Sequence, residues 1–138
     1  MIDRECGSAS MRTLSWHDVD VAVSTLVVRY GTQSFSGIHG IPRGGLVLSV
    51  CLSHRLQVPW LAEPQPGCLI LDDVVESGRT LAPLRQVPDS LAVVWISKGP
   101  PQWWQALEVS ASDEWILFPW ENPAAATSDE QNYKTSRR

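Results

Sequence analysis

Apolar residues recur at helical spacing near the start of the chain and gather into short continuous runs farther along it. After the capping-box sequence Ser15-Trp16-His17-Asp18, they follow the period of an amphipathic helix that ends near Gly31. A second helical pattern covers residues 46–56. The spacing therefore predicts two helices in the first half of the chain.

Short apolar runs bounded by turn residues predict strands over residues 35–41, 58–62, 68–71 and 91–96. Between residues 80 and 86 there is room for only a short helix, whose first turn tolerates Pro83. Strands that alternate with helical segments are typical of an α/β protein with a parallel sheet. Residues 1–12 are polar and small, so we expect the fold to begin near Leu14.

Composition and charge narrow the class of protein. A chain of 138 residues with 43% hydrophobic residues can bury one substantial core. The net charge of −4 offers no basic face to nucleic acid and weighs against a DNA-binding regulator. Three cysteines without CxxC spacing favour free thiols in a reducing cytosol. Because no apolar run approaches the roughly 18 residues of a membrane span and no secretory h-region is present, we expect a cytoplasmic protein without a membrane partner.

Residues 68–80 carry the most informative chemistry. A buried strand leads into Asp72 and Asp73, and the turn Glu76-Ser77-Gly78-Arg79-Thr80 follows. Ligands of parallel sheets bind beyond the carboxyl ends of the strands. Carboxylates there can bind ribose hydroxyls or Mg²⁺, and the backbone N–H groups of the turn can cradle a phosphate. The alternative is a strand-to-helix turn whose carboxylates only cap and solvate.

Two further loops are expected at the same sheet edge. In Pro42-Arg43-Gly44-Gly45, two glycines allow close backbone approach to an anion and the guanidinium adds charge, which suits pyrophosphate; a turn without a ligand is the alternative. Lys98 can donate to O6 of a 6-oxopurine and discriminate against a 6-amino group, unless it is a solvated turn residue. Trp103 and Trp104 suggest a lid or a subunit interface, because adjacent large aromatics cannot easily both face one core.

Residues 68–80 resemble the phosphoribosyl pyrophosphate (PRPP) signature of type I phosphoribosyltransferases at every position, with Glu76 where Asp is more usual. Residues 41–46 look like the pyrophosphate loop of xanthine-guanine-type members. Residues 114–121 resemble their C-terminal Trp-Ile-x-x-Pro-Trp element, which forms part of a hood over the purine. The chain is thus identified as similar to the purine branch of this family, the xanthine-guanine and hypoxanthine type, over residues 14–121.

The resemblance implies transfer of a 5-phosphoribosyl group from PRPP to a 6-oxopurine, with Mg²⁺ as cofactor and release of pyrophosphate, as in purine salvage. It implies catalytic roles for Glu76 and Arg43, with Glu76 as general base, and a metal role for Asp73. The implied ribose and phosphate ligands are Asp72, Asp73, Ser77, Gly78, Arg79 and Thr80. The implied pyrophosphate ligands are Arg43, Gly44 and Gly45, and the implied base contacts are Lys98, Trp115 and Ile116.

The assembled prediction is an α/β domain over residues 14–121, with a parallel twisted sheet of about four or five strands, helices on both faces and a small hood. A flexible extension over residues 1–13 and a disordered tail over residues 122–138 would flank it. A homodimer is a further expectation.

One feature departs from the resembled family, which generally carries a long mobile loop before the PRPP strand. Here residues 63–67 form only a compact turn, so another segment would cover the site or the pocket would be unusually open. This keeps two alternatives in view. One is a non-catalytic regulatory protein that binds PRPP or a nucleotide, and the other is a phosphoribosyltransferase for a different nitrogenous base.

Overall fold

The computed structural model describes residues 11–111 and 113–125, which form two compact units. The larger unit is Asp20–Ser112, and the smaller contains the described residues up to Val19 and from Asp113 onward. The predicted extension over residues 1–13 and the predicted tail over residues 122–138 lie mostly outside the described residues. Within them, strand β1 (Met11–Thr13) occupies the last three residues of the segment for which we expected an extension.

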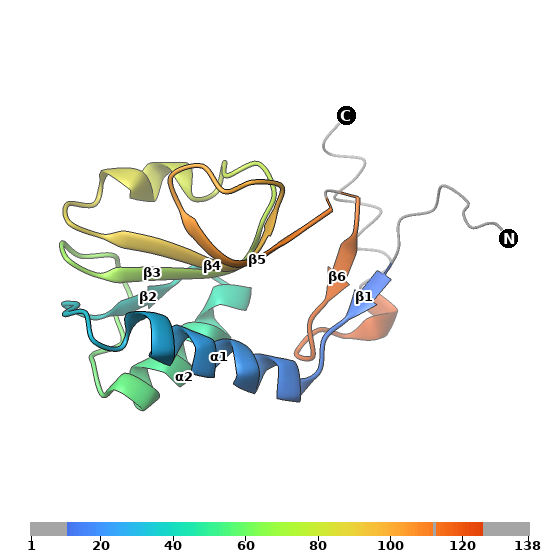
Figure 1. Ribbon diagram of the computed structural model, residues 1–138, viewed down its shortest axis with the longest axis horizontal. Helices are drawn as coiled ribbons and strands as arrows, with labels where there is room; N and C mark the ends of the chain where they lie inside the picture. The colour runs from blue at the N-terminus through green and yellow to red at the C-terminus, as the bar shows by residue number, and fades with distance from the viewer. Residues whose placement is uncertain (1–10, 112, 126–138) are drawn as a thin grey trace, which may run out of the picture. The chain divides into compact units, whose positions relative to one another are not determined.

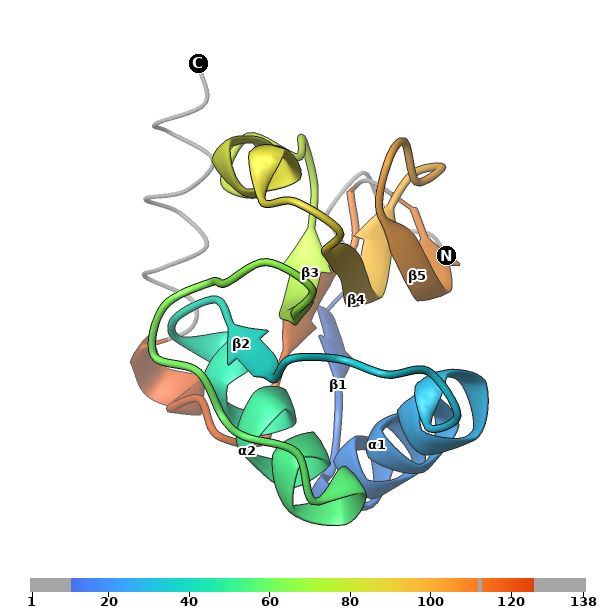
Figure 2. The ribbon, with the colours of Figure 1, turned by 90° about the vertical axis from the view of Figure 1, so that its left-hand side faces the viewer.

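The larger unit is built on a four-stranded sheet in which every strand pair is parallel. Its strands are β2 (Ile38–Gly40), β3 (Leu69–Val75), β4 (Leu91–Lys98) and β5 (Gln105–Ser110), in that spatial order (Figure 2). The predicted α/β class and parallel sheet are therefore confirmed. All four strands point their carboxyl ends toward the same edge, because parallel neighbours run in one direction.

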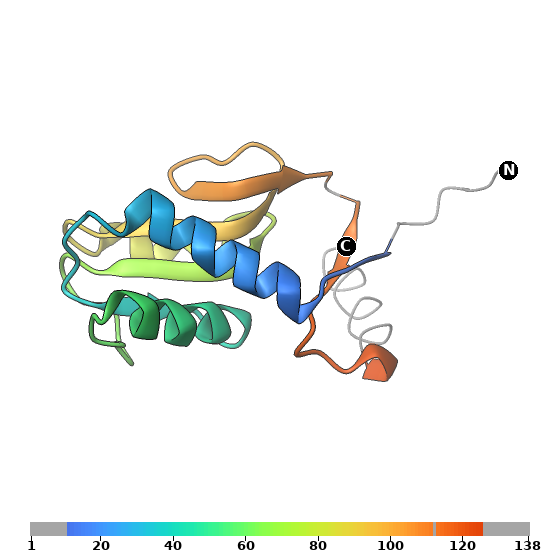
Figure 3. The same cartoon turned by 60° about the horizontal axis from the view of Figure 1, so that its bottom comes forward.

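Helical segments cover both faces of this sheet. Helix α2 (Gly44–Leu56) and residues 20–30 of α1 (Trp16–Tyr30) lie on one face, and the short 3₁₀ helix η1 (Ala82–Gln86) lies on the other (Figures 1 and 3). The Tyr30 hydroxyl at the end of α1 donates to the Gln105 side chain of β5. Among the described residues, none of the helices is long and apolar enough to cross a bilayer.

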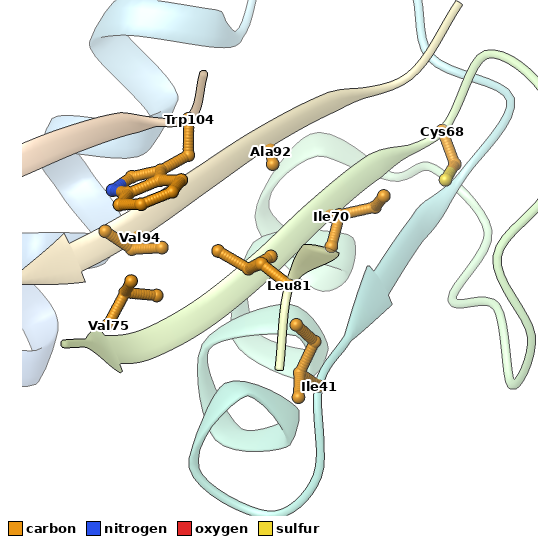
Figure 4. Close-up of a cluster of buried hydrophobic side chains, with 8 residues drawn as sticks. All are labelled: Ile41, Cys68, Ile70, Val75, Leu81, Ala92, Val94 and Trp104. Atoms are coloured by element: carbon orange, nitrogen blue, oxygen red, sulfur yellow. The ribbon is translucent and has the colours of Figure 1, made fainter. Parts of the chain in front are cut away.

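A cluster of buried apolar side chains joins β3 and β4 to the segment that leads into η1 (Figure 4). Its members are Ile41, Cys68, Ile70, Val75, Leu81, Ala92, Val94 and Trp104. Removing such side chains from water provides most of the favourable free energy of folding. The cluster contains residues from both ends of the predicted phosphate turn, so that turn rests on a packed base.

The smaller unit contains a two-stranded parallel sheet of β1 and β6 (Trp115–Leu117). The predicted capping box at the start of α1 is confirmed in this unit: the Asp18 N–H donates to Ser15 Oγ at 3.1 Å, and the Ser15 N–H donates to Asp18 Oδ2 at 2.8 Å. The same hydrogen bond from the Ser15 backbone lowers the pKa of the Asp18 carboxyl. Ser15 and Asp18 therefore determine where α1 begins.

Several elements differ from the prediction. The strands β1 and β6 are not among those predicted, and β2 and β3 cover residues 38–40 and 69–75 in place of 35–41 and 68–71. The strand expected over residues 58–62 is reduced to a single bridge between Trp60 and Ile38. Strand β5 was not predicted, because its mixed polar and apolar residues at a sheet edge give no strong pattern. Helix α2 starts at Gly44, two residues earlier than the apolar pattern indicates.

The prediction of a lid or subunit interface is wrong for Trp104, which is 4% exposed and lies in the core. Trp103 packs partly against the same cluster. The two rings meet edge to face, at 84° with centroids 5.8 Å apart, which lets neighbouring indoles share one apolar region. The guanidinium of Arg85 lies over the Trp103 ring, with Cζ 5.7 Å from the ring centroid.

Candidate functional site

The loops that follow β2, β3 and β4 all leave the same edge of the larger unit's sheet. The register pairs Gly40 with Leu71, one residue before Asp72, and Val75 with Ser97, one residue before Lys98. The polar and charged side chains that are predicted for the site in the larger unit lie in these loops, in the second half of β3 or at the end of β4. The edge is therefore the candidate functional site, in agreement with the rule for parallel sheets.

Asp72 and Asp73 lie near the end of β3, against the first turn of α2. Asp72 Oδ1 accepts the Asp73 N–H at 2.9 Å, and Asp73 Oδ1 accepts the Val74 N–H at 2.8 Å. Asp73 Oδ2 reaches the α-carbon of Gly44 so closely that a β-carbon at position 44 would overlap it. A glycine at position 44 therefore lets this carboxylate sit at the positive end of the helix.

Burial raises the pKa of both carboxyls, and the Asp73 charge raises the pKa of Asp72 further. Two adjacent carboxylates withdrawn from water are costly unless hydrogen-bond donors or a cation approach them. Within the described ranges, no cluster of three or more His, Cys, Asp or Glu side chains could hold a metal. A pair of hard oxygen ligands fits Mg²⁺, which binds proteins through one or two carboxylates when substrate phosphates complete its shell.

The predicted pyrophosphate loop connects β2 to α2. The peptide bond between Pro42 and Arg43 is cis, and the Arg43 side chain is exposed. The Gly45 N–H donates to the Ile41 carbonyl at 2.9 Å, and a β-carbon on Gly45 would lie 2.5 Å from the Leu71 carbonyl oxygen. Close packing of α2 on β3 is thus one reason for Gly45. Pyrophosphate binding by this loop stays a prediction.

The predicted phosphate turn follows β3, and most of its residues are exposed. Ser77, Arg79 and Thr80 are exposed, and Gly78 has a φ of +82°. The Arg79 N–H donates to Ser77 Oγ at 3.2 Å, and the Gly78 carbonyl accepts the Ala82 N–H at 3.0 Å. A left-handed glycine in such a turn allows successive N–H groups to converge on an anion, which is the geometry that a 5′-phosphate needs.

Glu76 and Lys98 form an ion pair across β3 and β4, with 3.4 Å between Oε2 and Nζ. The register accounts for this ion pair, because Val75 pairs with Ser97 and the next residues along the chain are Glu76 and Lys98. Their side chains are only 13% and 5% exposed, so Lys98 is not a solvated turn residue. Two residues predicted to contact the same base are therefore neighbours.

Trp115 and Ile116 belong to β6 in the smaller unit, where they pair with Met11 and Arg12 of β1. Ile116 is buried and Trp115 is half-buried. Their predicted contact with a purine stays a prediction. The other predicted site residues all belong to the larger unit.

The turn over residues 63–67 is as compact as the sequence indicates. Its backbone is held at three points: Ser36 Oγ donates to the Pro66 carbonyl at 2.8 Å, the Cys68 N–H donates to the Gln65 carbonyl at 3.1 Å, and the Gly67 N–H donates to the Pro88 carbonyl at 2.8 Å. These bonds tie the turn to the opposite end of the sheet.

Trp104, for which the sequence suggests a lid or a subunit interface, instead supports the candidate site. Trp104 lies beneath the phosphate turn, where a β-carbon on Gly78 would come within 2.7 Å of its ring carbons Cη2 and Cζ3. The signal for this contact in the sequence is Gly78. Because its positive φ alone already accounts for a glycine, the close packing of Gly78 on Trp104 does not show in the sequence.

Comparisons with known proteins find curated relatives of one kind. A xanthine-guanine phosphoribosyltransferase from Chromohalobacter salexigens is 28% identical over 134 residues, covering 79% of this chain and 83% of the relative. A protein of the same name from Gluconobacter oxydans is 27% identical over 142 residues, with the same coverage. No family model matches the chain.

Solved structures share the fold. A purine phosphoribosyltransferase from Pyrococcus horikoshii superposes with a TM-score of 0.67 at 24% identity, over 82% of this chain and 95% of that one. The xanthine-guanine-hypoxanthine phosphoribosyltransferase of Helicobacter pylori gives 0.66 at 18% identity, over 91% and 99%. The resemblance to the purine branch of the type I phosphoribosyltransferases is thereby confirmed, and the fold is that of the family.

Proposed function

We propose that this chain, a relative of the purine-branch type I phosphoribosyltransferases, transfers the 5-phosphoribosyl group of PRPP to a ring nitrogen of a 6-oxopurine and releases pyrophosphate. The observation that carries the proposal is the meeting of the carboxylate-rich end of β3 with Lys98 at one sheet edge, through the ion pair with Glu76. The names of the curated relatives support a purine phosphoribosyltransferase.

The ion pair is matched to one edge of a 6-oxopurine. The 6-oxo group is an acceptor and suits the Lys98 ammonium, whereas the N7 proton of the incoming base suits the Glu76 carboxylate. A 6-amino group would instead point donors at the ammonium. The 3.4 Å between Nζ and Oε2 lets the two side chains reach O6 and N7, which lie on the same edge of one base. Specificity for a 6-oxopurine is the finer part of the proposal.

In the reaction, the bond between ribose C1′ and the pyrophosphate oxygen breaks and a bond from C1′ to the purine nitrogen forms. Glu76 accepts the proton that the base loses, and Arg43 stabilises charge that develops on the departing pyrophosphate. Asp72 accepts hydrogen bonds from ribose hydroxyls. The exposed turn over residues 77–80 fixes the 5′-phosphate, so that C1′ is held at the edge of the sheet.

The buried carboxylates of Asp72 and Asp73 are the side chains that would hold Mg²⁺. Because burial raises the pKa values of both carboxyls, an approaching cation would stabilise their ionised forms. When bound, Mg²⁺ would neutralise the pyrophosphate leaving group. Dependence on Mg²⁺, a homodimeric state and a cytoplasmic location remain predictions.

The alternative of a regulatory protein that binds PRPP without chemistry is not favoured by the comparisons, because both curated relatives are named as enzymes. Use of a different nitrogenous base remains the question for experiment. Purified protein incubated with PRPP, Mg²⁺ and one base at a time should form the nucleotides of guanine, xanthine or hypoxanthine, separated by chromatography. Nucleotide formed from adenine or orotate at an equal or higher rate would overturn the 6-oxopurine proposal.

A further inference from the structure

Trp104 contacts two segments that the proposed reaction uses, the phosphate turn and the end of β4. It is 4% exposed and precedes β5, outside every motif that carries the family resemblance. On one side its ring carbons support Gly78 of the phosphate turn. On the other side its Nε1–H donates to Ser97 Oγ at 3.2 Å, immediately before Lys98.

The contact with Gly78 is tight and specific. An added β-carbon there would lie 2.7 Å from both Cη2 and Cζ3 of Trp104, a separation that packed side chains do not adopt. Val75 and Leu81, which flank the turn, belong to the same buried cluster as Trp104 (Figure 4). The exposed turn therefore rests on the buried ring of Trp104.

The polar end of the indole is fixed as firmly. Ser97 is 1% exposed, accepts from Trp104 and donates to the Gly99 carbonyl at 2.8 Å. In Figure 4 the indole nitrogen lies on the side of the ring nearest the end of β4. Because buried polar groups need partners, this chain of hydrogen bonds sets the rotation of the ring and joins it to the end of β4, where Lys98 lies between Ser97 and Gly99.

From these contacts we infer that Trp104 is a positioning residue that holds the 5′-phosphate turn at a fixed height above the sheet and ties it to the end of β4, where Lys98 lies. This inference rests on the proposed function. A turn that binds phosphate through its backbone N–H groups needs those groups held within a fraction of an ångström. Loss of the Trp104 ring beneath Gly78 would let them move. The effect is expected on the affinity for the ribose phosphate, before any chemistry.

The test measures the binding of PRPP and of ribose 5-phosphate by calorimetry, with Mg²⁺ and without a base. Trp104→Phe keeps an aromatic ring but removes Nε1 and the outer ring carbons that support Gly78. We expect it to weaken the affinity for both ligands by about tenfold, as displaced positioning groups commonly do. Trp103→Phe is the matched control, because that ring contacts Arg85 and the other indole, and it should bind like wild type.

A double-mutant cycle separates positioning from a general loss of packing. Gly78→Ala introduces a β-carbon that meets Trp104 and also strains the left-handed backbone. The backbone strain is the same in both backgrounds, so it cancels. In Trp104→Phe the alanine should therefore cost about fivefold less affinity than in wild type, a coupling typical of residues in contact.

The outcomes are distinct. Equal binding by Trp104→Phe and wild type, or additive effects of the two substitutions, would overturn the role of Trp104 while leaving the proposed function intact. Failure of wild type to bind either ligand would overturn the proposed function and this inference with it. Should Trp104→Phe fail to fold, Ser97→Ala tests the same contact: a loss of PRPP affinity supports the inference, and unchanged affinity overturns it.

Discussion

Glu76 Oε2 lies 3.4 Å from Lys98 Nζ, and both side chains are almost withdrawn from solvent. The pair forms because β3 and β4 end in register, with Val75 opposite Ser97. A charge pair of this kind contributes little net stability, since desolvation offsets much of the Coulomb attraction. Its position at the carboxyl ends of two parallel strands fits a role in recognising a base.

The first prediction concerns Glu76 as a base. Glu76→Gln keeps the shape of the side chain but cannot accept a proton, so turnover should fall by about a hundredfold or more. Binding of PRPP should stay close to wild type, because the ribose phosphate contacts are elsewhere. Steady-state kinetics with calorimetry checks both, and Glu63→Gln in the exposed compact turn is the control. Equal turnover by the variant would remove Glu76 from the mechanism.

The second prediction concerns specificity. Lys98→Met retains the length of the side chain and removes the donor that reads the 6-oxo group. The ratio of kcat/KM for guanine to that for adenine should fall by about a hundredfold, as when a site loses the hydrogen bond that selects its substrate. Competition kinetics with both bases measures this ratio directly. An unchanged ratio would show that another group reads the base.

The third prediction follows from the buried carboxylates. The pKa of Asp72 is raised in the folded state, so the folded chain binds a proton more tightly than the unfolded chain. The free energy of unfolding should therefore fall as the pH rises above the ordinary carboxyl value of about 4. Asp72→Asn removes this cost and should raise Tm at pH 8, by about 4 °C for each kcal/mol gained in the free energy of unfolding.

At pH 4.5 the gain from Asp72→Asn should shrink, because the carboxyl of the unfolded wild-type chain is then partly protonated too and folding requires less proton uptake. Thermal unfolding at the two pH values, without ligand or metal, supplies the comparison. Asp113→Asn, at an exposed position, should change Tm at neither pH. A pH-independent effect of Asp72→Asn would contradict a raised pKa.

The fourth prediction concerns the metal. If Asp73 helps to hold Mg²⁺, Asp73→Asn should raise the Mg²⁺ concentration that gives half-maximal PRPP binding by about tenfold. Removal of divalent ions with a chelator should weaken PRPP binding to wild type, and added Mg²⁺ should restore it. Identical Mg²⁺ titrations for variant and wild type would assign the ion to other groups.

Much of the site follows from local sequence. The apolar residues before Asp72 predict a buried strand, and position at the end of a parallel strand is enough to place the carboxylates at a ligand edge. The start of α1 is equally local, because Ser15 and Asp18 satisfy each other's backbone groups. Such features need no knowledge of distant contacts.

The remaining features depend on contacts between distant segments. The ion pair of Glu76 with Lys98 requires the register of β3 and β4, which neither strand specifies alone. The burial of Trp104 depends on β5, whose edge position leaves its sequence too polar for a clear strand pattern. Likewise, Gly44 is required by the approach of the Asp73 carboxylate, which a reading of its own loop does not indicate.

The most direct test of the proposed activity is pyrophosphate release from PRPP and Mg²⁺ with each of guanine, xanthine, hypoxanthine, adenine, uracil and orotate. Asp73→Ala serves as the blank. We predict release with one or more 6-oxopurines that the blank lacks, in equal amount to the nucleotide formed. Binding of PRPP without pyrophosphate release from any base would contradict the proposal and indicate a protein that binds the ligand without performing the transfer.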